Sequence, residues 1–197
     1  MLLLKQNKEM KKLALALVLV SGFSFAQVKN VFSSDIHWWG YKIVKTESSS
    51  HDGTVDLKSG SIVMKGKNIA AGTFILDMNT INATDLSGEY QQKLNGHLKN
   101  GDFFETDKFP TATFKITSIA KGKTKEYNTV ITGNLTAKGK TSAISFPANV
   151  TYKDGVVSIN SAKFSFDRQK FDISYNSGMK DSMIKDEIDM QIKLSAK

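Results

Sequence analysis

The sequence predicts an all-β protein made of antiparallel strands, with one inserted α-helix. Several segments alternate apolar and polar residues with a period of two, which is typical of strands that face water on one side. Short turns, most of them glycine-containing, separate these segments, and one segment has apolar residues four apart instead. Seven or eight strands fit either a sandwich or a closed barrel. The helix favours a barrel of about eight strands, because its apolar side needs an open mouth to cover.

The strands and turns can be placed along the chain from this alternation. The predicted strands cover residues 36–45, a stretch through Val55 and Leu57, then 61–65, 70–80, 111–117, 129–137, 143–152, 156–166 and a closing strand from Ile184 to Leu194. Turns are expected at residues 58–60, 66–68, 121–126, 138–140 and 153–155. The polar stretch 46–52 is expected to form a loop or to begin the second strand.

Two strands are predicted to be irregular. Pro147 cannot donate to a strand ladder, so its strand is expected to lie at a sheet edge or to carry a bulge there. In the strand over residues 156–166 the apolar positions change parity between Ile159 and Phe164. A slip of one residue predicts a bulge near Asn160 or Ser161.

The inserted helix is predicted from four apolar residues spaced by four: Leu86, Tyr90, Leu94 and Leu98. It is expected to end near Gly96 or Gly101. The Asp102-Phe103-Phe104 turn that follows carries two aromatic side chains, which we expect to dock on an apolar surface. Helix and turn together are interpreted as a lid over the sheet.

The N-terminal residues predict export. Two lysines precede an apolar run over residues 13–20, and small residues stand at Ser24 and Ala26. This pattern is typical of a signal peptide cleaved after Ala26, with a mature domain over residues 27–197 in the periplasm or outside the cell. The apolar run is shorter than the roughly 20 residues that a membrane-spanning helix needs.

The composition argues against disulfide bonds and against nucleic acid as a partner. The chain has no cysteine, so no disulfide supports the fold. Its net charge is +8, but the lysines are scattered and Arg168 is the single arginine. Arginine is the main bidentate reader of phosphates and guanines, so nucleic acid is not an expected partner.

The order of several motifs resembles the YceI-like family. The motifs are residues 36–42 and 51–55, the Gly96-His97-Leu98 and Asp102-Phe103-Phe104 steps, residues 109–114, residues 133–141, and the Asp167-Arg168 and Phe171-Asp172-Ile173 steps. The similarity extends from about residue 35 to residue 194. It implies a lipocalin-like barrel with a deep apolar pocket, and dimers in some members. A homodimer and transient contact with a membrane are therefore among the expected partnerships.

The resemblance also implies a carrier rather than an enzyme. The expected ligand is a long apolar molecule, such as a polyisoprenoid, an isoprenoid quinone or a fatty amide. From the residues alone, the inward-facing side chains could equally be a packed core; the resemblance turns them into a pocket lining. The expected ligand-binding residues are Phe74, Leu76, Met78, Phe114, Ile116, Phe146, Val150, Phe164, Phe166, Arg168, Ile188, Met190 and Ile192. The competing interpretations are a structural or stress-related barrel without a ligand and a weak hydrolase.

No motif in the sequence predicts catalysis, a metal or a cofactor. His37, His51 and His97 lack the spacing of metal ligands, and each is interpreted as structural. Neither a G-x-S-x-G nucleophile motif nor a glycine-rich phosphate loop occurs. Carboxylate pairs such as Asp186-Glu187 alternate across a strand, so one of the two is expected to point inward or to lie at the rim while the other faces water, and a hydrolytic pair stays a minor alternative. Arg168 has two interpretations: contact with the polar head of a ligand at the pocket mouth, or an ion pair that fixes a loop.

Overall fold

The computed structural model describes residues 26–44, 47–175 and 182–197. The predicted signal segment lies almost wholly outside these residues. The elements are β1 (Ala26–Val44), β2 (Glu47–Lys65), β3 (Asn68–Ala83), α1 (Gly88–Lys99), β4 (Thr111–Lys121), β5 (Thr129–Ala137), β6 (Lys140–Lys153), β7 (Val156–Ser161), β8 (Phe164–Asp167), the short 3-10 helix η1 (Arg168–Phe171), β9 (Ser182–Ile184) and β10 (Glu187–Ala196).

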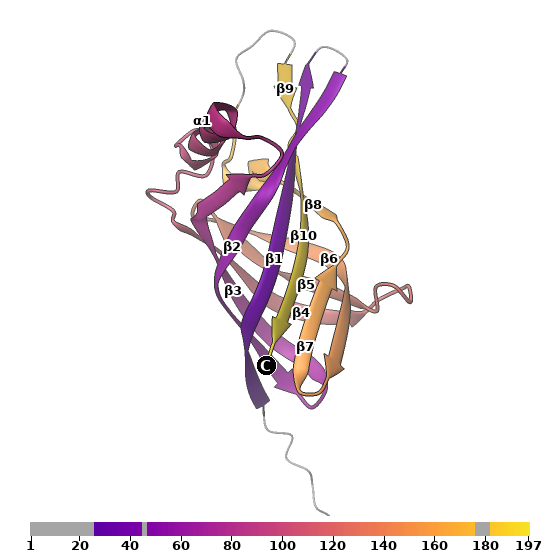
Figure 1. Cartoon of the computed structure of the whole chain (residues 1–197). Helices are drawn as coiled ribbons and strands as arrows, with labels where there is room; N and C mark the ends of the chain where they lie inside the picture. Colours follow the sequence, from indigo (N-terminus) through magenta and orange to yellow (C-terminus); the bar gives the residue numbers. More distant parts are fainter. Residues whose placement is uncertain (1–25, 45–46, 176–181) are drawn as a thin grey trace, which may run out of the picture.

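The strands close into an antiparallel barrel (Figure 1), which confirms the predicted fold class. They pair in the order β1–β2–β3–β4–β5–β6–β7–β10, and β10 pairs back with β1 to complete a ring of eight. β8 continues β7 along β10, and β9 adds to the end of β1. The helix α1 lies at one end of the barrel, called here the upper end, and the C-terminus lies at the other (Figure 1).

The predicted turn at residues 58–60 is wrong. These residues lie inside β2, which runs unbroken from Glu47 to Lys65. The register between β2 and β3 slips by one residue there, so the segment forms a bulge. A Cβ on Gly60 would come within 2.8 Å of Val31 Cγ2, so this glycine serves close packing across the bulge rather than a chain reversal. The two strands predicted on either side of it are therefore one.

The first strand begins at Ala26, ten residues before its predicted start at Ile36. An extra residue between Val31 and Ser33 shifts the register with β10. Below this bulge the inward face carries Lys29, which is 4% exposed, while Phe32 faces outward. Because the bulge reverses which face each residue occupies, no alternation continues across it.

The predicted slip in the penultimate strand is confirmed. One more residue separates Asn160 from Phe164 than separates their two partners on β10. The strand is divided there into β7 and β8. The Oγ of Ser161 accepts a hydrogen bond from the Ile192 N–H at 2.8 Å, which satisfies a donor that the irregular ladder would leave free.

Pro147 lies where β6 becomes a sheet edge, as predicted. The pairing of β6 with β7 ends at Ala148, and the Ala162 N–H then donates to the Pro147 carbonyl at 2.9 Å. In an antiparallel strand the N and O of one residue point to the same side. Pro147 lacks an N–H on the side where the pairing with β7 has already ended, so no hydrogen bond of the ladder is lost there.

The helix is confirmed, but its predicted apolar stripe is only partly correct. Leu98 is buried and Leu94 packs against the core, whereas Tyr90 is 75% exposed. Two amides hold the helix instead. Asn95 accepts from the Ala83 N–H at 2.8 Å, and the Gln91 side chain donates to the Ala83 carbonyl at 2.7 Å. Amide hydrogen bonds to the end of β3 thus replace the apolar contact expected from Tyr90.

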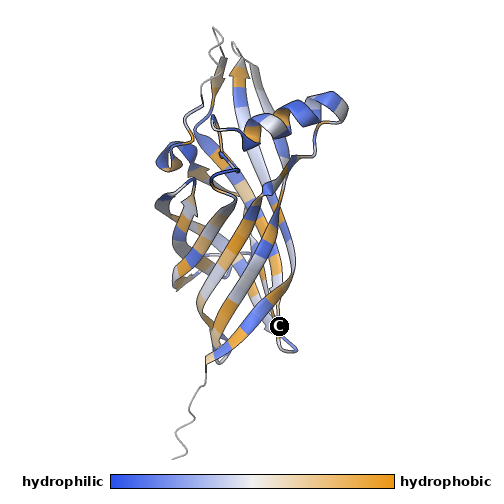
Figure 2. Ribbon diagram, turned by 90° about the vertical axis from the view of Figure 1, so that its left-hand side faces the viewer, coloured by the Kyte–Doolittle hydropathy of each residue, from blue (hydrophilic) through white to orange (hydrophobic). Residues whose placement is uncertain are grey.

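The core fills the barrel along its length in two clusters of buried apolar residues. Hydrophobic and hydrophilic residues alternate along the strands in Figure 2, and α1 is largely hydrophilic. Among the described residues no helix is long and apolar enough to cross a membrane.

Candidate ligand-binding cavities

Two apolar cavities lie inside the barrel. The upper cavity, at the α1 end, has a volume of about 90 Å³, and the lower cavity has about 60 Å³. A single water needs roughly 10–15 Å³ of such space, so each cavity has room for several atoms. Apolar side chains form the whole lining of the lower cavity and nearly all of the upper one. Cavities of this kind stay dry or take an apolar guest.

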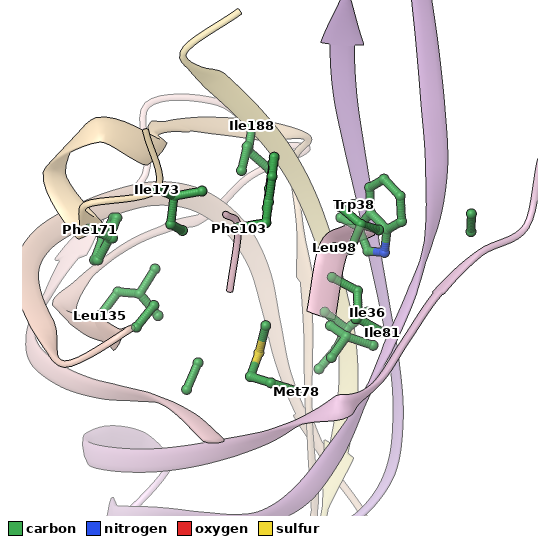
Figure 3. Packing of buried hydrophobic residues seen from close by; sticks show 14 residues of the cluster. Ile36, Trp38, Met78, Ile81, Leu98, Phe103, Leu135, Phe171, Ile173 and Ile188 are labelled. Carbon is green, nitrogen blue, oxygen red and sulfur yellow. The ribbon is translucent and has the colours of Figure 1, made fainter. Parts of the chain in front are cut away.

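The end of α1 and the turn after it cover the upper cavity. Leu98 is the residue of α1 that reaches the lining, and Phe103 and Phe104 from the turn lie beside it. The two phenylalanine rings meet edge to face at 5.2 Å between centroids. Figure 3 shows Phe103 within the buried cluster that also contains Ile188 of β10. The predicted docking of this turn on an apolar surface is confirmed.

Phenylalanines and aliphatic side chains together form the wall of the lower cavity. Phe146 stacks on Phe164 with ring centroids 4.4 Å apart, and Phe114 lies 5.7 Å from Phe146. Beyond the cavity, toward the C-terminal end of the barrel, Ile62, Met64 and Val157 are almost completely buried. This solid layer is called here the floor.

A more polar hollow of about 210 Å³ adjoins the upper cavity. The two share Trp38, Leu98 and Phe103 among their lining residues. Lys42, His51 and His97 line the hollow but neither cavity, so the hollow is more polar than the cavities behind it. The hollow therefore forms an entrance, and a molecule with an apolar chain and a polar head would place its head there.

The structure brings the predicted pocket residues together with one exception. Phe166, Arg168, Met78 and Ile188 line the upper cavity. The residues that line the lower cavity are Phe74, Phe114, Ile116, Phe146, Phe164 and Ile192, and Leu76 and Met190 line both. Val150 lines neither. It packs, half-buried, against the lower core, because the cavity ends before its level on β6.

Sequence reasoning missed several lining residues. Trp38, Val55 and Leu135 belong to predicted strands and face the interior, so their parity alone was a usable signal. No sequence signal separated the residues beside a void from those packed against one another. Leu98 and Phe103 were predicted as lid residues and prove to be part of the lining as well.

Arg168 is buried, at 3% exposure, and its contacts match the loop-fixing interpretation. Its Nε donates to the Lys185 carbonyl at 3.1 Å, and Nη1 donates to the Ile173 carbonyl. Nη2 lies 3.0 Å from Asp186 Oδ1. The guanidinium therefore ties η1 and the segment after it to the turn before β10, while also forming part of the upper cavity wall.

The three histidines make separate contacts and do not form one site. His51 lies in β2, which begins at Glu47, so residues 46–52 follow the second of their two predicted alternatives; the Nδ1 of His51 is 2.7 Å from Asp85 Oδ2. His97 packs edge to face on Tyr175, with ring centroids 4.2 Å apart. His37 lies beside Trp39. Within residues 26–44, 47–175 and 182–197, no group of three or more histidine or carboxylate side chains could hold a metal ion.

The Asp186-Glu187 pair does not reach either cavity. Both residues are exposed, and Asp186 also accepts from the Gln169 side chain at 3.0 Å. The prediction that one of the two points inward or lies at the rim is wrong. Asp186 instead lies in the turn before β10, where its carboxylate is occupied by Arg168.

A second carboxylate, Asp189, anchors a network on the outer face of the barrel. Tyr41 Oη donates to Asp189 Oδ2 at 2.6 Å, Ser165 Oγ donates to Oδ1, and Lys163 Nζ lies 3.4 Å from Oδ2. Burial by itself would raise the pKa of Asp189, but these three donors outweigh it and hold the pKa below the ordinary value of 3.8. The network joins β1, β8 and β10 near the closure of the barrel.

A closed antiparallel barrel around apolar cavities, entered beneath a helical cover, is the architecture of barrels that hold apolar small molecules. The chain belongs to the family described as the YceI-like domain, whose model matches residues 30–196.

Relatives and solved structures agree with this assignment. The UPF0312 protein of Pseudomonas aeruginosa (strain LESB58) is 36% identical over 92 residues, which are 46% of this chain and 44% of that protein. The UPF0312 protein of Pseudomonas paraeruginosa matches to the same extent. The alignment thus spans less than half the length of these curated relatives.

Two solved structures share the fold. Burkholderia cenocepacia BcnA aligns with a TM-score of 0.60 and 18% identity, over 83% of this chain and 96% of BcnA. A polyisoprenoid-binding domain from Saccharophagus degradans, implicated in plant cell wall breakdown, aligns with a TM-score of 0.58 and 11% identity, over 88% of this chain and 99% of that domain. At these identities the likeness concerns the fold.

Proposed function

We propose that this protein is exported and holds a long apolar molecule in its barrel for transport or sequestration. The ligand class is a polyisoprenoid, an isoprenoid quinone or a fatty amide. The observation that carries the proposal is the pair of apolar cavities that follow one another inward from a polar entrance. The polyisoprenoid-binding domain of Saccharophagus degradans, which shares the fold, supports the choice of ligand.

Burial of the chain alone does not account for uptake from a membrane. Each buried methylene is worth roughly 0.8 kcal/mol against water, but a bilayer offers the same chain an equally apolar environment. Selectivity must then come from the polar entrance. Because the donors of Arg168 are already occupied and His51 already pairs with Asp85, His97 and Lys42 are better placed to meet a ligand head.

Export is supported by the position of the expected cleavage site. Cleavage after Ala26 would remove only the first residue of β1, and Gln27 already pairs with Met64 of β2. A mature chain starting at Gln27 therefore keeps the barrel closed. The intact mass of the protein recovered from the cell envelope or the medium tests this, and a mass that includes residues 13–20 would contradict it.

A barrel without a ligand is the second candidate, and the small volumes of the cavities favour it. Side chains that fill the barrel would leave no space for a long chain unless they move. Extraction of the purified protein with organic solvent, followed by mass spectrometry, separates the two functions. A stoichiometric long-chain compound is expected. An empty extract, together with no binding of added fatty amides, would favour the barrel without a ligand.

A further inference from the structure

Three side chains divide the interior of the barrel. Leu76 of β3, Leu135 of β5 and Met190 of β10 line the upper and the lower cavity at once. They come from three different strands of the ring, so together they form a layer across the barrel rather than a ridge on one wall. This layer is called here the partition.

The order of residues along each strand places the partition between the cavities. On β10, Ile188 lines the upper cavity, Met190 lines both, and Ile192 and Leu194 line the lower one. Alternate residues of a strand are about 6.6–6.8 Å apart, so each step inward moves one layer deeper. The sequence of layers on this strand is therefore upper cavity, partition and lower cavity.

The other two strands repeat this order. On β3 it runs from Met78 through Leu76 to Phe74, and on β5 from Ala137 through Leu135 to Ile131. The agreement of three strands means that the boundary between the cavities is made of side chains at one level of the barrel. No backbone crosses the interior at that level among the described strands, so a change of rotamers is enough to join the cavities.

The composition of the partition suits it to movement. Met190 has an unbranched side chain with three rotatable bonds and fits irregular spaces. It is only partly buried, in contrast to the floor residues Ile62, Met64 and Val157. The partition can therefore yield to a guest, whereas the floor is packed on all sides and ends the space available to it.

We propose that Leu76, Leu135 and Met190 act as a gate that sets the length of the apolar chain held in the barrel. A short chain fills the upper cavity and leaves the partition closed. A longer chain displaces Met190 and continues into the lower cavity as far as the floor. This inference rests on the proposed function, and it identifies residues that decide which members of the ligand class bind.

The gate predicts a stepped dependence of affinity on chain length. Each methylene that enters an apolar cavity should tighten binding about fourfold, the equivalent of roughly 0.8 kcal/mol. The affinity should stop rising at the chain length that first reaches the partition, because the free energy needed to move the partition side chains opposes binding. It should rise again for longer chains. A cavity without a partition would give one continuous rise.

Straight-chain fatty amides of increasing length provide the test, with binding measured by displacement of a fluorescent apolar probe. In Met190→Ala the pause should disappear, and long amides should bind several-fold tighter relative to short ones. Met190→Phe should weaken the binding of long amides and leave the affinity for short amides unchanged. Leu135→Ala should also remove the pause. If the Met190 variants do not fold, Leu135→Ala alone tests whether the partition causes it.

Ile119→Ala is the matched control. Ile119 packs against the lower core but lines neither cavity, so its truncation should leave the length profile as in the unmodified protein. Identical profiles for the unmodified protein, Met190→Ala and Leu135→Ala would overturn the gate. A failure of the proposed function looks different, because the unmodified protein would then bind no amide of any length.

Discussion

Replacement of Arg168 by methionine should destabilise the protein without emptying the barrel. The variant keeps a long flexible side chain but loses the donors that hold the Ile173 and Lys185 carbonyls and the partner of Asp186. A hydrogen bond from a charged donor contributes about 1.5–3 kcal/mol, and an ion pair with a half-exposed carboxylate adds about 0–1 kcal/mol. Because methionine restores some apolar contact, we expect a net loss of about 3 kcal/mol.

Urea unfolding at neutral pH measures this loss, and thermal unfolding gives a second reading. For a domain of this size, 1 kcal/mol corresponds to about 2–4 °C, so the midpoint should fall by about 6–12 °C. Lys170→Met is the control, since it removes a positive charge from the same short helix at an exposed position and should change the midpoint little. Fatty amides should still bind to Arg168→Met below its unfolding temperature.

One result would refute this reasoning. If Arg168→Met were as stable as the unmodified protein but no longer bound fatty amides, the guanidinium would serve the ligand head rather than the loop. The first interpretation of Arg168 from the sequence would then be the correct one.

Two further predictions concern the cover and the outer network. Replacing Phe103 and Phe104 together by serine should speed hydrogen exchange across α1 and leave the central strands protected, because Phe103 is buried and Phe104 is partly buried, and full burial of such a ring contributes about 1.5–3 kcal/mol. Unchanged exchange in α1 would show that Gln91 and Asn95 hold the helix unaided. Because the pKa of Asp189 is lowered in the folded state, its stabilising contribution is full above the ordinary value of 3.8 and is lost as the pH falls through the folded value. Asp189→Asn should therefore be less stable than the unmodified protein at pH 7, with a smaller difference near pH 3 by urea unfolding, and an equal difference at both pH values would contradict the assignment.

Strands in which apolar and polar residues alternate without interruption were predictable from the sequence. Residues 129–137 were predicted as a strand and form β5 with the same bounds. Strict alternation places every second side chain inside, so the pattern depends on local chain geometry alone. The slip near Ser161 was predictable for the same reason, because a change of parity is visible without knowledge of the partner strand.

The bulges in β1 and β2 were beyond such reasoning. Each arises from the pairing with a distant strand, β10 in one case and β3 in the other. Residues 58–60 contain a serine and a glycine, a composition that fits a turn as well as a bulge. Only the tertiary structure decides between them, since the answer depends on whether Gly60 packs against Val31 or turns away from it.

The class of fold, the inward faces of most strands and the position of the covering turn could all be predicted from the sequence. Those features follow from periodicity and from the burial of aromatic side chains, which are local properties. The tertiary structure alone decided that Arg168 is occupied by backbone carbonyls, that Val150 lies beyond the cavities, and that Leu76, Leu135 and Met190 share one layer. These residues are far apart along the chain, and their levels in the barrel depend on the register of strands that meet only when the ring closes.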